Sequence, residues 1–187
     1  MIYISKGVVQ AGSTEQLLHV ARCGIDFELT GVRAGLWLDG RFGFAEEKDS
    51  LRIKELAHLN RIGIVEIAEE DTELGKYRAL TQCVICPAET KLLRAAIKKE
   101  DADTLFWIQN AGLRLAIAEL VFLTENRVRP EPELLHAENR QALTERIYTR
   151  ETIFDNILET QMETAFSRDK TVKSVLRLLQ KKRILLL

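Results

Sequence analysis

The sequence predicts an α+β protein that is mainly helical and carries a few short strands. After Pro87 the apolar residues recur every three or four positions, which is typical of helices. Before Pro87, short runs rich in β-branched residues, such as Ile64-Val65-Glu66-Ile67, interrupt the helical pattern. Pro87 itself marks the change between these two halves.

The composition is that of an ordinary globular protein. The 187 residues are 46% hydrophobic and 29% charged, and the formal net charge of −1 gives no overall field that favours nucleic acid or membranes. No apolar run approaches the roughly 18 residues of a membrane span, and the first residues lack the pattern of a signal peptide. Three cysteines make a disulfide framework an unlikely basis for the fold. We therefore expect a cytoplasmic protein that does not insert into membranes.

The first elements are predicted as a strand and a helix. Ile2 to Gln10 is rich in β-branched residues and predicts a short strand. Ser13 is a suitable N-cap for a helix over Thr14 to Cys23, whose leucines are spaced for one apolar face, and Gly24 would end that helix.

Two further helices and a hairpin follow. Helices are predicted over Thr30 to Gly40 and over Ser50 to Asn60. Strands over Ile64 to Ile67 and Tyr77 to Ile85, separated by the polar turn 70–75, are predicted to pair as an antiparallel hairpin. In this order of helix, helix and hairpin, the first half resembles winged-helix regulators. The resemblance implies that the second helix and the hairpin would face a partner.

The second half is predicted to be helical up to a closing strand over Ile184 to Leu187. Its candidate helices are Glu89 to Lys99, Asp103 to Asn110, Ala116 to Asn126, Glu133 to Tyr148, Glu151 to Phe166 and Lys170 to Lys182. We therefore expect a winged-helix-like domain over residues 1–87 and a helical domain over residues 88–187.

The two halves share part of their sequence pattern. Phe27 to Phe42 matches Leu113 to Val128 at a constant separation of 86 residues, and Asp49 to Ile64 matches Asp169 to Ile184 at a separation of 120. The second separation is longer than the first, and the extra residues of the second half predict a two-helix insertion over Glu133 to Phe166. The second half is then a degenerate second winged-helix-like module, or its apolar spacing resembles the first half by chance.

One candidate nucleic-acid surface is the helix over Ser50 to Asn60, which occupies the place of a recognition helix. Its candidate phosphate contacts are Arg52, Lys54, His58 and Arg61. Glu55 on the same helix would repel phosphate, so a helix that binds protein is an equally good interpretation.

A second candidate surface is the last helix. Lys170, Lys173, Arg177 and Lys181 are spaced three, four and four residues apart, which places them on one helix face. Such a row suits contacts to a phosphate backbone. The alternative is a solvated helix end, where cations are stabilising without any partner.

The cysteines allow a zinc hypothesis. Cys83 and Cys86 form a C-x-x-C pair and, with His19 and Cys23, could supply four ligands. Against this, residues three apart on a strand point to opposite faces, so buried thiols or a redox pair are the alternatives.

The sequence has no recognisable catalytic motif. It lacks a Gly-x-Ser-x-Gly nucleophile motif and a phosphate-binding glycine loop. Because it has three histidines, it offers few candidates for acid–base catalysis. We therefore predict that the protein is not an enzyme and requires no cofactor.

Two functional hypotheses follow. The first is a winged-helix DNA-binding protein, a small transcriptional regulator that acts as a homodimer on double-stranded DNA through its basic helices. The alternative is a tandem winged-helix protein–protein interaction module, an adaptor or scaffold subunit that does not bind nucleic acid.

Overall fold

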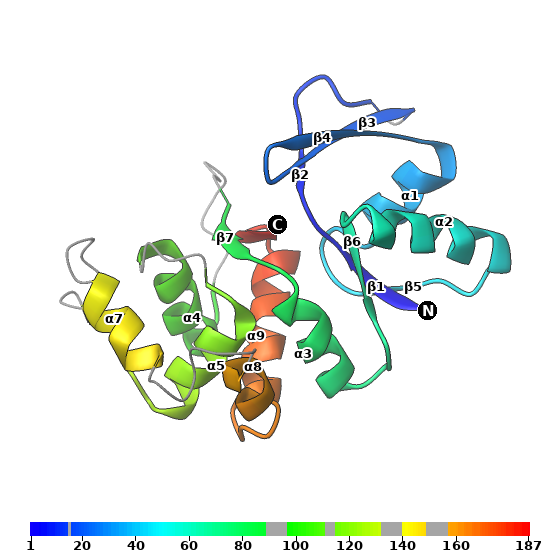
Figure 1. Ribbon diagram of the computed structural model, residues 1–187. Coiled ribbons are helices and arrows are strands. Elements are labelled where there is room, and N and C mark those ends of the chain that lie inside the picture. The colour runs from blue at the N-terminus through cyan, green and yellow to red at the C-terminus, as the bar shows by residue number, and fades with distance from the viewer. Residues whose placement is uncertain (15, 89–96, 111–114, 132–139, 149–156) are drawn as a thin grey trace. The chain divides into compact units, whose positions relative to one another are not determined.

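The computed structural model describes residues 1–14, 16–88, 97–110, 115–131, 140–148 and 157–187, and it confirms the α+β class (Figure 1). The chain divides into two compact units. Unit 1 comprises residues 1–83 and 185–187, and unit 2 comprises residues 84–184.

Unit 1 contains two antiparallel three-stranded sheets. The first has the order β5–β1–β6, and the second has the order β2–β3–β4. The strands are β1 (Ile2–Ser5), β2 (Val8–Val9), β3 (Leu17–Arg22), β4 (Ile25–Thr30), β5 (Ala45–Glu46) and β6 (Val65–Ala68). Among the described residues β4 pairs with β3 alone, so its other side is an edge of the second sheet as described.

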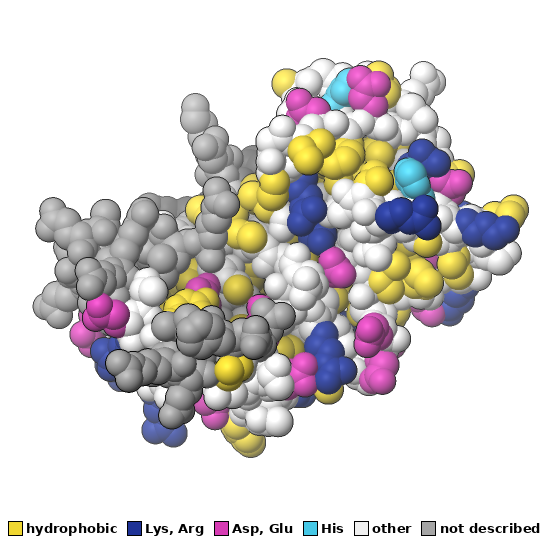
Figure 2. Space-filling model, in the orientation of Figure 1, with side chains coloured by type: hydrophobic (Ala, Val, Ile, Leu, Met, Phe, Trp, Pro, Cys, Tyr) yellow, Lys and Arg dark blue, Asp and Glu magenta, His cyan; other side chains and the backbone are white. Residues whose placement is uncertain are grey.

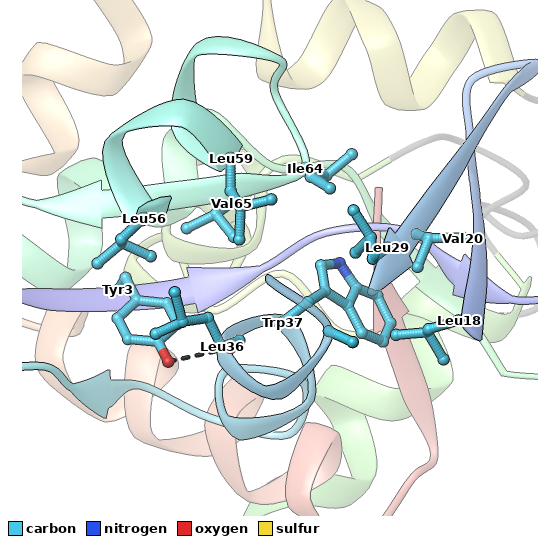
Figure 3. Close-up of a cluster of buried hydrophobic side chains, with 11 residues drawn as sticks. Tyr3, Leu18, Val20, Leu29, Leu36, Trp37, Leu56, Leu59, Ile64 and Val65 are labelled. Carbon is cyan, nitrogen blue, oxygen red and sulfur yellow. Dashed lines mark hydrogen bonds between the residues drawn. The ribbon is translucent and has the colours of Figure 1, made fainter. Parts of the chain in front are cut away.

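The helices of unit 1 are α1 (Gly31–Asp39), α2 (Ser50–Arg61) and α3 (Glu73–Thr81). The first two confirm the helices predicted there. The core between α1, α2 and the two sheets is built around Trp37, whose side chain is fully buried (Figure 3). Its indole Nε1 donates a hydrogen bond to the carbonyl oxygen of Lys6 at 3.1 Å, so its polar atom is satisfied inside the core. The Tyr3 hydroxyl likewise donates to the Leu36 carbonyl at 2.9 Å.

The helix predicted over Thr14 to Cys23 is wrong, because this segment forms β3 and the turn that leads into β4. Cys23 and Gly24 both have positive φ, 51° and 82°, which is the conformation of a two-residue type I′ hairpin turn. Leu18 and Val20 are buried in alternation with half-buried neighbours, and that period of two belongs to a strand.

The predicted hairpin over residues 64–85 is also wrong. Strand β6 pairs with β1, and most of the segment from Tyr77 onward lies in α3 or in the turn after it. The Thr72 hydroxyl accepts a hydrogen bond from the Gly75 amide at 3.0 Å and caps this helix. The winged-helix order predicted for the first half therefore lacks its wing.

Unit 2 is mainly helical. Its elements are β7 (Ile85–Pro87), α4 (Lys99–Asn110), α5 (Ile117–Glu125), α7 (Arg140–Ile147), α8 (Ile157–Met162) and α9 (Arg168–Gln180), and the closing strand β8 (Ile184–Leu186) begins at its end. Helix α9 packs against both α4 and α5, and α5 also packs against α8. The buried faces of these helices form the core of the unit.

The structure tests most of the helices predicted for the second half. Helices α4, α5 and α9 and strand β8 confirm the elements predicted there. Helix α7 covers the later part of the segment predicted over Glu133 to Tyr148, and α8 covers part of that over Glu151 to Phe166. Most of the helix predicted over Glu89 to Lys99 lies outside the described residues.

Helices α1 and α5 are equally long. Their first residues are 86 positions apart, which is the separation that the predicted repeat gives. Each ends with the same hydrogen bond: the Gly40 amide donates to Leu36 in α1, and the Asn126 amide donates to Phe122 in α5. After α2 and α9, the amides of Ile64 and Arg183 both donate to a carbonyl five residues earlier, but these two residues are 183 − 64 = 119 positions apart, one fewer than the repeat predicts. The hydrogen bonds that end α1 and α5 support the first part of the repeat, which stays a prediction.

Candidate functional site

Two charged side chains of α2 are paired within unit 1. Arg52 forms ion pairs with Asp39 at 3.2 Å and with Glu47 at 2.5 Å. Glu55 pairs with Arg33 at 2.6 Å. Because Arg52 is already paired with two carboxylates, a phosphate group would have to displace them to reach it.

The remaining α2 candidates are few. Lys54 and Arg61 are exposed and His58 is half-buried. At the start of the helix, Asp49 accepts hydrogen bonds from the backbone amides of Arg52 and Leu51, and these bonds lower the pKa of its carboxyl. The amides that could bind an anion at this helix end are thus already used by the protein's own carboxylate.

The basic row on α9 is divided by an internal ion pair. Lys170 and Lys173 are exposed. Arg177, one helical turn further on, donates to both carboxylate oxygens of Asp101 on α4, with its closest nitrogen at 2.5 Å. The charge of Lys181 also acts on Asp101. Half of the predicted row therefore serves the packing of α4 on α9.

The start of α9 is held by an acidic residue at the end of α5. The Glu125 carboxylate accepts a hydrogen bond from the backbone amide of Ser167 at 2.8 Å. Hydrogen bonds from Ser167 lower the pKa of Glu125, and the nearby charge of Arg127 adds to the effect. Helices α8 and α9 are joined by the turn that this contact fixes.

Unit 2 contains a cavity of about 310 Å³ between α4, the end of α5 and the first turns of α9. Its lining combines cations, hydroxyl groups and apolar side chains. The cations are Arg127, Arg129 and Lys170, all of them exposed at the mouth. Arg127 and Arg129 were not singled out by the sequence analysis, because nothing local shows that the end of α5 meets the start of α9.

The candidate zinc ligands do not share the geometry that their spacing suggested. His19 lies on β3 and Cys23 lies in the hairpin turn, so they are not on one helix face. Cys83 is buried, and burial raises the pKa of its thiol to about 12. The described part of the chain holds no group of three or more histidine, cysteine or acidic side chains placed to bind a metal ion.

The open edge of β4 is the feature of unit 1 that the sequence analysis missed. The carbonyl of His19 accepts a hydrogen bond from Gln10 on the side of β3 away from β4. The pair His19–Glu28 is therefore of the non-hydrogen-bonded type, and the backbone N–H and C=O of Glu28 point to the outer edge. The same alternation directs the backbone groups of Asp26 outward, and also the N–H of Thr30, whose C=O belongs to the first turn of α1 because Thr30 is the N-cap of that helix. The signal that could have revealed this edge was the Cys23-Gly24 turn between two alternating runs.

The surface of the molecule shows no single basic area on the face drawn in Figure 2, where Lys and Arg side chains are scattered among acidic and apolar ones. No helix among the described residues is long and apolar enough to cross a membrane.

Comparison with protein-family models, with curated proteins and with solved structures found no match to this chain.

Proposed function

We propose that this chain is a protein-interaction module that binds an extended segment of a partner polypeptide along the open edge of β4. The observation that supports this proposal is the outward direction of the backbone N–H and C=O groups of Asp26 and Glu28, to which Thr30 adds its N–H. An antiparallel edge of this kind can be extended by one more strand, whose backbone hydrogen bonds supply affinity.

The side chains around the edge define the chemistry of the partner. Asp26 and Glu28 are both exposed and, two residues apart on one strand, share one face of the sheet. Cross-strand pairs of opposite charge are favourable, so the added segment should carry Lys or Arg at every second position. Ile25, the first residue of β4, is 58% exposed and suits an apolar residue at one end of that segment.

This proposal corresponds to the second of the two functional hypotheses, without its winged-helix geometry. Arg52 on α2 is already paired with two carboxylates, and α3 stands where the wing was expected. Both features count against a DNA-reading role for unit 1.

The experiment selects binding peptides from a displayed library of random 12-residue sequences and measures the affinity of one selected peptide for three variants. Glu28→Pro removes the outward N–H without breaking a bond to β3, and it should weaken binding about tenfold through the lost hydrogen bond. Glu28→Lys reverses one charge and should weaken it about threefold. Glu69→Lys makes the same charge change at another exposed position of unit 1 and is the matched control.

Two results would overturn the proposal. Selected peptides without alternating basic residues would contradict the partner chemistry. A peptide that binds the Glu28→Pro variant as tightly as the unchanged protein would show that the β4 edge is not the binding surface. Circular dichroism of each variant establishes that the sheet has folded.

DNA binding is the second candidate, and one observation favours it. Helix α9 follows α8 across a short turn, packs on α5, and exposes Lys170 and Lys173 near its start. A homodimer could present two such helices to successive turns of a duplex. An electrophoretic shift with mixed-sequence duplex at low salt tests it: no shift at micromolar protein rules it out, and a shift that Lys170→Gln with Lys173→Gln abolishes supports it.

A further inference from the structure

We propose that the cavity of unit 2 binds a small hydroxyl-rich compound that carries a phosphate monoester, such as a sugar phosphate or a nucleoside monophosphate. The site lies wholly within unit 2 and uses no residue of the β4 edge, so it stands or fails independently of the proposed peptide-binding function.

The cavity separates charge at its mouth from neutral polar groups at its floor. Arg127, Arg129 and Lys170 are exposed at the mouth, and the charge of Arg127 also acts on Glu125, which already accepts the Ser167 amide. The lining carboxylates are Glu100, which already pairs with Arg177 at 3.2 Å, and the exposed Asp103. Cations therefore outnumber uncommitted carboxylates at the mouth, which favours a compact anion there.

The polar groups of the floor offer hydrogen-bond acceptors to a ligand. The Thr171 hydroxyl donates to the Ser167 carbonyl at 3.0 Å, and the Thr124 hydroxyl donates to the Leu120 carbonyl at 2.8 Å. The Ser174 hydroxyl donates to Asp101 at 2.8 Å. A hydroxyl that has given its proton to the protein still offers lone pairs, so these groups suit the O–H or N–H donors of a hydroxyl-rich compound.

The walls beside these groups are apolar. Trp107 and Leu123 are buried and contribute to the lining, and Val128 is half-buried. A cavity with apolar walls, a few polar groups and a volume near 300 Å³ is at the small end of the range for ligand sites.

Unit 1 carries larger side chains at the positions that match two of the residues lining the cavity. At the separation of 86 residues that relates α1 to α5, Leu123 and Val128 correspond to Trp37 and Phe42. In unit 1 the guanidinium of Arg41 lies over both aromatic rings, at 5.7 and 4.7 Å from their centroids. In unit 2 smaller side chains stand at both positions, and Arg127, the counterpart of Arg41, is exposed and lines the cavity.

The experiment measures binding of glucose 6-phosphate and AMP by isothermal titration, with glucose, adenosine and inorganic phosphate as reference probes. We expect one of the two phosphorylated compounds to bind at least tenfold more tightly than both its unphosphorylated parent and inorganic phosphate. That pattern requires the charged mouth and the neutral floor to act together.

Two variants assign the binding to the cavity. Val128→Phe restores the aromatic residue of unit 1, keeps every cation, and should lower affinity at least tenfold by filling the space. Lys170→Gln should lower it about tenfold, whereas Lys173→Gln, an exposed lysine of the same helix outside the cavity, should leave it unchanged. Thermal unfolding of each variant establishes that unit 2 is folded.

Three results would overturn the proposal. The first is the absence of any phosphorylated probe that binds better than its parent. The second is full affinity in the folded Val128→Phe variant, which would mean that surface charge alone is responsible. The third is equal loss in the Lys170→Gln and Lys173→Gln variants, which would place the anion along α9 and outside the cavity.

Discussion

Asp101 and Arg177 join α4 to α9 through an ion pair in which the carboxylate has no exposed surface. The guanidinium donates to both oxygens of Asp101, and the Ser174 hydroxyl donates to one of them at 2.8 Å. Burial raises the pKa of Asp101, but the hydrogen bonds and the charge of Arg177 outweigh burial, so the pKa is lower than usual. The two residues are 76 positions apart in the sequence.

Removal of one member of this pair should destabilise unit 2. We expect Asp101→Leu to lower the free energy of unfolding by about 3 kcal/mol, the lower end of the range for breaking a buried pair, because Arg177 is partly exposed. Combining it with Arg177→Leu should recover part of the loss, since no charge is then left unpaired. Urea unfolding followed by circular dichroism measures both; equal stability of the single and double variants would contradict a specific pair.

The same pair should make stability depend on pH in the acid range. Because the folded pKa of Asp101 lies below its unfolded value of about 3.9, its contribution is present above that pH and is lost as the pH falls through the folded pKa. We expect the stability of the unchanged protein to fall more steeply below pH 4 than that of Asp101→Asn. Thermal unfolding between pH 2 and 6 tests this, and parallel curves for the two proteins would count against it.

Two glycines of unit 1 should respond in opposite ways to alanine. A Cβ on Gly40 would lie 2.6 Å from the Ser5 hydroxyl oxygen and 2.8 Å from the Tyr3 ring, so Gly40→Ala should cost about 1–3 kcal/mol. A Cβ on Gly35, inside α1, meets nothing within 4 Å, so Gly35→Ala should stabilise by about 0.5–1 kcal/mol. Thermal unfolding gives both values. A stable Gly40→Ala protein would mean that the close approach of α1 to β1 is not required.

The thiols should differ in their reactivity. Cys23 is exposed in the hairpin turn, whereas Cys83 is buried and its pKa is raised to about 12. We expect a thiol reagent at pH 8 to label Cys23 rapidly and Cys83 only after unfolding. Mass spectrometry of peptides from the labelled protein identifies each site, with Cys23→Ser as the control. Rapid labelling of Cys83 in the folded protein would contradict its burial.

The sequence predicted the elements whose signals are local. Helices α1, α2 and α9 were located because apolar stripes and a capping residue such as Asp49 act over a few positions. Asp39 and Glu47, which pair with Arg52, also lie nearby in the chain. The spacing of apolar residues does not show which charged side chains come into contact, so these ion pairs could not be predicted.

The wrong predictions for β3 and β6 have two different causes. In β3 the spacing of Leu17, Leu18 and Ala21 fits a helix as well as a strand, and the Cys23-Gly24 turn was not recognised as a hairpin signal. In β6 the partner strand is β1, about sixty residues earlier, and no local pattern predicts such a pairing. The cavity of unit 2 was missed for the same reason, because its lining comes from three helices that are distant in the sequence.

Amide hydrogen exchange in β4, measured residue by residue by NMR, tests the proposed function most directly. In the free protein the amides of Phe27 and Leu29 should exchange slowly, because they bond to β3, and those of Asp26, Glu28 and Thr30 should exchange rapidly. Addition of a selected basic peptide should slow exchange at Asp26, Glu28 and Thr30. Protection of all these amides in the free protein, or no change at those three positions with the peptide bound, would contradict an open edge that binds a partner strand.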